Sequence, residues 1–155
     1  ISNSQDFLLL QTDVNAQYKA LWIKQSIDPE SGIIFSENDA LLNFDTTKAS
    51  RFLYTPDRFS YPADIFIAPD AAGYIFIVDS ERDSLYQFTQ KGFEGVNAPA
   101  NSNITKQILA SFGGEGSGPF QFISPSGVCY FKKTLYVADK GNNRISRFKL
   151  STDLE

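Results

Sequence analysis

The segment 122–148 constrains the fold more than any other part of the sequence, because two earlier stretches are imperfect copies of it. It begins with Pro125-Ser-Gly127 and continues with an alternating apolar run, a two-lysine turn and a second apolar run that ends at Asp139. A Gly-Asn-Asn turn and a third run follow. Short runs of period two, separated by turn residues, predict a meander of three antiparallel β-strands.

The copies indicate a repeat architecture. The second copy ends at Phe88, and a weaker one before it covers 18–55. The phenylalanines Phe44, Phe88 and Phe148 close the three copies. Repeats of roughly 40 to 60 residues that contain four short strands are typical of propeller blades. We therefore predict an all-β chain built of β-propeller blades, each of four antiparallel strands.

The same pattern predicts the boundaries of the blades. A strand over 6–12 precedes the first copy and is expected to complete another blade. Blade A covers 18–55, blade B covers 59–112 with an inserted loop over 92–103, and blade C covers 122–155 and lacks a fourth strand. The strands are expected near residues 18–24, 33–36, 41–44 and 51–55 in blade A, 63–68, 74–78, 84–90 and 105–112 in blade B, and 127–132, 134–138 and 144–150 in blade C.

Three blades do not close a ring, since propellers have about four to eight. We expect residues 1–155 to be part of a larger propeller of the six-bladed type. The remaining blades would come either from the same polypeptide or from a second copy, with the 6–12 strand exchanged between the two chains.

The third copy resembles a known family. The motifs Phe122-x-x-Pro-x-Gly-Val, Leu-Tyr-Val-Ala-Asp139 and Gly-Asn-Asn-Arg-Ile-x-x-Phe148 resemble the NHL repeat of β-propellers, and the glycine-rich segment 113–121 is similar to the lead-in of such repeats. The resemblance implies a surface that recognises a protein, a glycan or another ligand. It identifies no ligand-binding residue.

The polar residues that recur in the copies are expected to belong to the scaffold. Asp79 and Asp139 each follow an apolar run and precede a turn, where a carboxylate can accept hydrogen bonds from backbone amides. The resemblance implies that Asn143 supplies a turn amide and that Arg144 can pair with a carboxylate such as Asp139. The structural repeat residues predicted in this way are Asp79, Asp139, Asn143, Arg144, Pro62, Pro125 and Gly127.

Two classes of function follow. The first is a non-catalytic binding or assembly module that presents propeller loops to a ligand. The alternative is a segment of a propeller enzyme, a lyase or hydrolase, whose active residues lie mostly outside this stretch. Metal-dependent enzymes that resemble NHL propellers rely on histidine ligands, and this sequence contains no histidine. We predict no catalytic residue, metal or other cofactor in this stretch, and stoichiometric zinc in the purified protein would contradict that.

Charge and hydropathy bear on partners and location. The formal net charge of −4 at pH 7 argues against a nucleic-acid partner. No stretch approaches the roughly 20 apolar residues of a transmembrane helix, so we expect no membrane span. Few charges, loops rich in Asn, Ser and Thr, and the NHL resemblance favour an extracytoplasmic or cell-surface location. A gene that begins at a plain cytosolic methionine would contradict this expectation.

Overall fold

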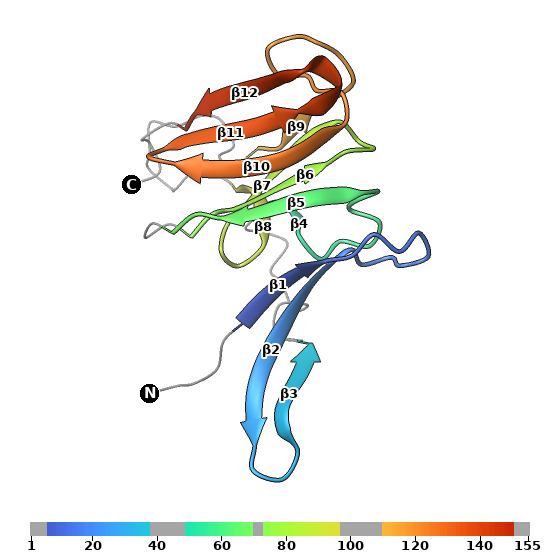
Figure 1. The fold of residues 1–155 in the computed structure, drawn as a ribbon, viewed down its shortest axis with the longest axis vertical. Coiled ribbons are helices and arrows are strands. Elements are labelled where there is room, and N and C mark those ends of the chain that lie inside the picture. The colour runs from blue at the N-terminus through green and yellow to red at the C-terminus, as the bar shows by residue number, and fades with distance from the viewer. Residues whose placement is uncertain (1–5, 38–48, 70–72, 97–109, 151–155) are drawn as a thin grey trace.

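The computed structural model describes residues 6–37, 49–69, 73–96 and 110–150, which form small antiparallel β-sheets (Figure 1). No α-helix occurs among these residues, so the predicted all-β fold is confirmed. The sheets are β1–β2–β3 (Asp6–Leu10, Ala20–Asp28, Gly32–Glu37), β4–β8 (Ala49–Phe52, Phe93–Val96), β5–β6–β7–β9 (Pro62–Ile67, Ile75–Asp79, Ser84–Phe88, Phe112–Gly113) and β10–β11–β12 (Pro125–Phe131, Thr134–Asp139, Arg144–Lys149).

Blades B and C contain the same meander. In each, a proline opens the first strand and pairs with the aspartate that ends the second, as Pro62 with Asp79 and Pro125 with Asp139. A register shift follows the proline in both sheets. In blade B the fourth strand, β9, pairs with β7. The two copies recognised in the sequence are therefore copies in backbone pairing as well.

The first part of the chain differs from expectation. The strand expected over 6–12 to complete another blade is β1, and it pairs instead with β2, from Asp6 opposite Lys24 to Leu10 opposite Ala20. The physical reason is burial, because Leu8 and Leu10 pack against the same core as Ala20.

The fourth strand expected for blade A, over 51–55, corresponds to β4, but β4 belongs to a different sheet from β2 and β3. Strand β4 pairs with β8, so the predicted loop 92–103 begins as a strand. Phe52 and Phe93 pack edge to face at 5.2 Å between ring centroids and fix this pairing. Residues 41–44, where the third strand of blade A was expected, lie outside the described residues. So do residues 97–109, which include the rest of that loop and most of the strand expected at 105–112. The division of the chain into blades A, B and C stays a prediction.

Two apolar cores lie on the two faces of the β5–β6–β7–β9 sheet. The first core lies between β1–β2 and one face of β5–β6–β7, and the second lies between the other face of β5–β6–β7 and β10–β11–β12. Strand β6 is consequently buried at all five residues, which explains its unbroken apolar run. In β11 the burial alternates, because only one face of its sheet is covered by described residues. Within the described part of the chain, no helix is long and apolar enough to span a membrane.

Candidate functional site

The corner between β11 and β12 is built around the fully buried carboxylate of Asp139. Its Oδ1 accepts a hydrogen bond from the Ile123 amide at 2.8 Å. Its Oδ2 accepts from Arg144 Nε at 2.8 Å and from Asn142 Nδ2 at 2.9 Å. Asn143 follows in the left-handed conformation, with φ +52°, and turns the chain into β12. The ion pair implied by the family resemblance is therefore present.

The other nitrogens of Arg144 fasten the glycine-rich lead-in. Nη1 donates to the Ser117 carbonyl at 2.7 Å, and Nη2 donates to the carbonyls of Gly118 and Gln121, each at 2.9 Å. A planar guanidinium can reach the carboxylate and these carbonyls at once because its donors point in fixed, divergent directions. Arg144 thus ties the lead-in to the corner.

Asp79 occupies the matching corner of blade B and is also fully buried. Its Oδ1 accepts from the backbone amides of Tyr61, Glu81 and Arg82 at 3.0 to 3.1 Å. Its Oδ2 accepts from the Ser60 amide at 2.6 Å. The Arg82 guanidinium donates to Ser60 Oγ and not to the carboxylate. Asp79 is therefore held by four backbone amides.

Two further carboxylates join blade B to blade C. Asp64 Oδ2 accepts from the Val128 amide at 2.9 Å, and Asp83 Oδ1 accepts from the Ser124 amide at 2.6 Å. Asp83 has φ +48° and holds in blade B the turn position that Asn143 holds in blade C. Sequence reasoning missed both links, because a hydrogen bond between sheets leaves no periodic signal.

The predicted structural residues lie in these two corners, on different sheets. Asp139, Arg144 and Asn143 meet in one, opposite Pro125, whereas Asp79 and Pro62 form the other. Gly127 lies just after the register shift in β10, where its backbone comes close to the Asp64 carboxylate.

A buried ion pair was also missed by sequence reasoning. Arg58 Nη2 donates to Glu94 Oε2, and these side chains are only 9% and 4% exposed. The guanidinium lies over the Tyr86 ring, 4.5 Å from its centroid, and burial raises the pKa of the Tyr86 phenol. Glu94 belongs to β8, whose pairing with β4 was not predicted, so nothing in the sequence pattern pointed to this pair.

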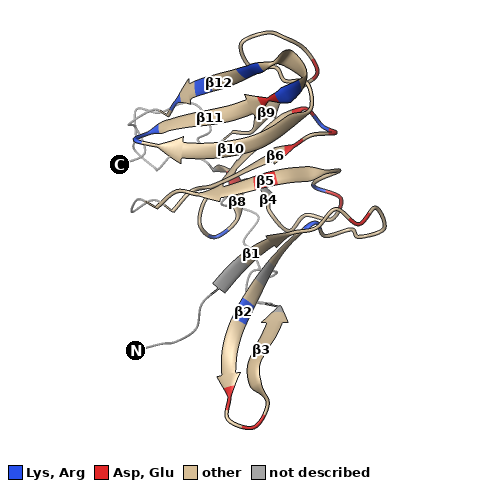
Figure 2. Cartoon of the chain, in the orientation of Figure 1, with Lys and Arg blue, Asp and Glu red and all other residues tan. Residues whose placement is uncertain are grey.

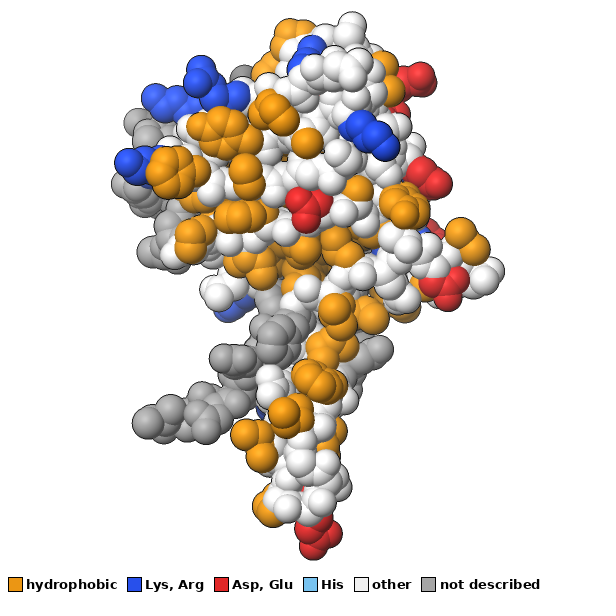
Figure 3. Space-filling view, in the orientation of Figure 1, with side chains coloured by type: hydrophobic (Ala, Val, Ile, Leu, Met, Phe, Trp, Pro, Cys, Tyr) orange, Lys and Arg blue, Asp and Glu red, His pale blue; other side chains and the backbone are white. Residues whose placement is uncertain are grey.

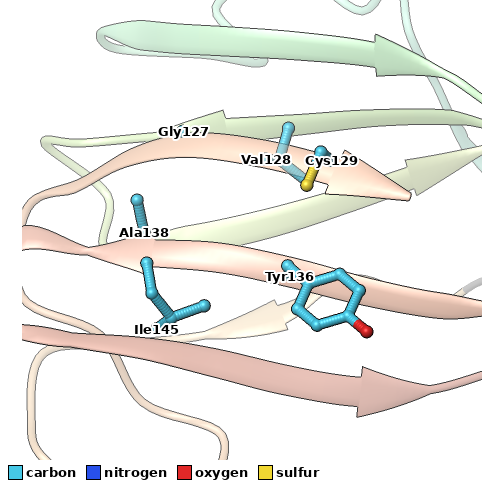
Figure 4. A pocket seen from close by; sticks show the side chains of 6 residues that line it. All are labelled: Gly127, Val128, Cys129, Tyr136, Ala138 and Ile145. Atoms are coloured by element: carbon cyan, nitrogen blue, oxygen red, sulfur yellow. The ribbon is translucent and has the colours of Figure 1, made fainter. Parts of the chain in front are cut away.

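The face of β10–β11–β12 that points away from the second core carries an open apolar depression of about 390 Å³ (Figure 4). Successive strand residues point to opposite faces, which directs Cys129, Tyr136, Ala138 and Ile145 to this side while Leu135 and Val137 enter the core. Ile145 is 65% exposed. We call this surface the outer face, and its apolar residues are Cys129, Phe131, Tyr136, Ala138 and Ile145.

Three cations border the outer face. Arg147 pairs with Tyr136 across β12 and β11, and Lys149 pairs with Thr134, so both extend from the same side as the depression. Lys132 lies in the β10–β11 turn, with its ammonium 5.1 Å from the centroid of the Phe131 ring. Figure 2 shows these basic positions on β12 and at the end of β10. The outer face therefore has an apolar centre and a positive rim.

Metal-ligating side chains do not gather in the described part of the chain, where no three His, Cys, Asp or Glu residues come together. The buried carboxylates Asp79 and Asp139 are occupied by the hydrogen bonds described above. The outer face offers a ligand exposed apolar contact with an electrostatic rim.

Comparison with family models matches residues 122–148 to the NHL repeat. The match begins at Phe122, runs through the three strands of β10–β11–β12, and ends at Phe148. A search among curated proteins found no match for the chain.

Proposed function

We propose that this chain, which carries an NHL repeat at residues 122–148, is a non-catalytic binding and assembly module that docks a protein partner through the outer face. NHL repeats build propeller blades, and such blades serve binding and assembly. One observation carries the proposal. The matching face of the preceding sheet, β5–β6–β7–β9, is covered by the sheet β10–β11–β12.

The equivalence follows from the register of the two sheets. Aligning Pro62 with Pro125, and the aspartates opposite them, places four core residues of blade B at the positions of four outer-face residues of blade C. The residues that correspond to Cys129, Tyr136, Ala138 and Ile145 are Phe66, Phe76, Val78 and Leu85. All four pack in the second core, beneath β10–β11–β12.

Exposed apolar surface of this kind favours docking. Contiguous apolar patches with a polar rim mark interaction sites on soluble proteins. Ile145 and Phe131 are 65% and 61% exposed, so their burial by a partner would be favourable at about 25 cal/mol per Å² of apolar surface. The lining offers few hydrogen-bonding groups for sugar hydroxyls, which favours a protein surface over a glycan.

The arrangement of the buried carboxylates supports a non-catalytic role. Asp79 is enclosed by four backbone amides, and Asp139 is paired with Arg144. A carboxylate held in this way stabilises a turn and is not positioned to exchange protons with a ligand.

The test uses a dye that fluoresces in apolar surroundings, 1-anilinonaphthalene-8-sulfonate, whose sulfonate the positive rim would attract. We expect the dilute chain to bind the dye and the substitution Ile145→Asp to lower the fluorescence, because the charge would lie in the centre of the depression. The matched control is Val14→Asp, at a residue that is 88% exposed and outside the face. Equal fluorescence for Ile145→Asp and the unchanged chain, at equal thermal stability, would contradict the proposal.

A further inference from the structure

We propose that the end of the sheets at which the β10–β11 turn lies is a docking surface for an acidic segment of a protein partner. We call it the turn surface, and its basic residues are Lys91, Lys132, Lys133 and Lys149. It differs from the outer face, although Lys132 and Lys149 border both. The inference goes beyond the proposed function, because it assigns a second contact and states the chemistry of that contact.

The directions of the strands bring these lysines to one end. Strands β5 and β10 both begin at the corners, because the proline that opens each strand pairs with a corner aspartate. The hydrogen bond from the Ser124 amide to Asp83 places the two corners beside each other. Antiparallel pairing directs β7 and β12 the same way as β5 and β10. Lys91, in the β7–β8 turn, and Lys149, at the end of β12, therefore lie at the end opposite to the corners (Figure 1).

Three of the lysines come together at the β10–β11 turn. Lys132 and Lys133 form the tip of this turn, and the Leu150 amide donates to the Lys133 carbonyl at 2.7 Å. This bond, and the pairing of Lys149 with Thr134 at the start of β11, bring Lys149 beside the turn. Like charges at neighbouring positions repel each other, so an anion that contacts all three lysines is favoured.

The backbone of this turn is unfavourable for lysine. Lys132 and Lys133 have φ +47° and +60°, and both therefore adopt the left-handed conformation. Two-residue hairpin turns of this kind favour Asn-Gly or Gly-Gly, because a Cβ atom is disfavoured in that conformation. The conformation of the turn does not explain the two lysines. Unfavourable backbone of this kind is typical of positions that are kept for function.

Charge is divided between the two ends of these sheets. Exposed acidic residues lie at the corner end, namely Asp57, Glu81 and Glu115. Among the described residues of β5 to β12, no exposed Asp or Glu lies at the turn end. Figure 3 shows basic side chains gathered over the ends of β10 and β12 and acidic ones at the opposite end of these sheets. The turn surface is thus a positive patch on a chain whose formal net charge is −4.

The turn surface stays exposed when both faces of a sheet are covered. Apolar cores lie on both faces of β5–β6–β7–β9, yet Lys91, just beyond the end of β7, is exposed. A further sheet over the outer face would bury the centre of that face and leave the β10–β11 turn in contact with solvent. The turn surface is therefore available to a partner whether or not such a sheet is present.

A short acidic segment fits this patch better than a membrane or a nucleic acid does. Membranes and nucleic acids present negative charge over an area wider than the patch, so they would also face the acidic corner end. A segment with a few Asp or Glu residues can contact the lysines alone, because salt confines charge interactions to roughly 8 Å at physiological ionic strength. Complementary charge of this kind raises the rate of association and orients the partner.

The test measures the fluorescence anisotropy of a labelled oligo-glutamate peptide on titration with the whole 155-residue chain. We expect saturable binding that weakens as salt is raised. The double variant Lys132→Asn, Lys133→Gly should weaken binding by at least about tenfold. It should also raise the melting temperature, because it supplies the residues that the turn conformation favours. A more stable chain that has lost binding excludes misfolding as the cause of the loss.

A matched pair of single variants separates position from net charge. Lys149→Gln removes one positive charge at the turn surface, and Lys140→Gln removes one from an exposed side chain at the corner end. We expect Lys149→Gln to weaken peptide binding and Lys140→Gln to leave it unchanged. Equal effects of the two variants would show that the peptide responds only to the net charge of the chain, and would overturn the inference.

Other probes separate the classes of partner. Vesicles that contain phosphatidylserine, and a single-stranded oligonucleotide with the same net charge as the peptide, should each bind more weakly than the peptide. Tighter binding of either probe would overturn the assignment of an acidic protein segment. Absence of peptide binding at low salt would overturn it as well. Dye binding at the outer face is a separate measurement, so this inference and the proposed function can fail independently.

Discussion

The corners at Asp79 and Asp139 occupy the same place in their sheets but hold their carboxylates by different means. Each carboxylate is fully buried, and each aspartate lies opposite a proline in the neighbouring strand. The donors to Asp79 are four backbone amides. The donors to Asp139 are one backbone amide, one side-chain amide and the Arg144 guanidinium. The buried carboxylate is thus common to both repeats, whereas the ion pair occurs in one.

The arginine has a second role that the comparison brings out. Arg144 fastens the lead-in of blade C through three carbonyls. In blade B the equivalent position is Ser84, yet Arg82 fastens the segment before β5 through the Asp57 carbonyl and Ser60 Oγ. A guanidinium therefore ties the incoming chain to the corner in both blades, from different positions in the turn.

The largest expected effect is at Asp79. Asp79→Ala would remove the acceptor of four amides, and we expect the free energy of unfolding to fall by about 3 kcal/mol. A buried donor left unpaired costs about 1 to 3 kcal/mol, whereas the amides near the surface form hydrogen bonds to water instead. Urea unfolding, followed by circular dichroism at concentrations where the chain is monomeric, measures it.

Asp79→Asn is the matched control, because it keeps one oxygen acceptor and replaces the other by an amide that faces backbone N–H groups. It should cost less than Asp79→Ala. If Asp79→Ala proves milder than the equivalent change at Asp139, then backbone donors are not the stronger anchor, and the comparison between the corners fails.

The effect at Asp139 is expected to be smaller, about 2 kcal/mol for Asp139→Ala, because Arg144 is partly exposed and can regain water when its partner is lost. Combining Asp139→Ala with Arg144→Ala should cost less than the sum of the two single changes, and the difference measures the ion pair. Arg144→Lys should be more stable than Arg144→Ala but less stable than the unchanged chain, since a lysine cannot reach the carboxylate and three carbonyls together. Full additivity of the single changes would show that the pair contributes nothing.

The sequence predicted most of what these corners contain. The repeat of proline, alternating run, aspartate and turn is a local pattern, and local backbone pairing reproduces it in blades B and C. The donors to each carboxylate were only partly foreseen. Turn amides follow from the position of Asp79, whereas the bonds from Ser60 and Tyr61 come from the loop that leads into β5 and depend on tertiary packing.

The first blade was predicted less well for a physical reason. Packing of buried side chains determines which strands β1 and β4 pair with. Leu8 and Leu10 join the first core, and Phe52 packs on Phe93. The continuous apolar run of β1 is equally compatible with pairing in its own sheet or in another, so the sequence pattern alone could not decide. The outer face escaped notice because Cys129, Tyr136 and Ile145 look like ordinary strand residues, and only the stacking of the sheets reveals which side is covered.

The smallest expected effect compares the two turn residues in the left-handed conformation. Asn143→Gly should change stability by no more than about 0.5 kcal/mol, since Asn143 already tolerates φ +52° and glycine does so without strain. Asp83→Gly keeps the equivalent φ of +48° but removes the acceptor of the Ser124 amide, so it should cost about 1 kcal/mol. Because both positions share one backbone conformation, the difference between the two variants isolates the hydrogen bond that joins blade B to blade C. Asp83→Asn, which retains an oxygen acceptor, should have a stability between those of the two glycine variants. Equal unfolding midpoints for both glycine variants would show that the hydrogen bond between Ser124 and Asp83 does not stabilise the packing of the two sheets.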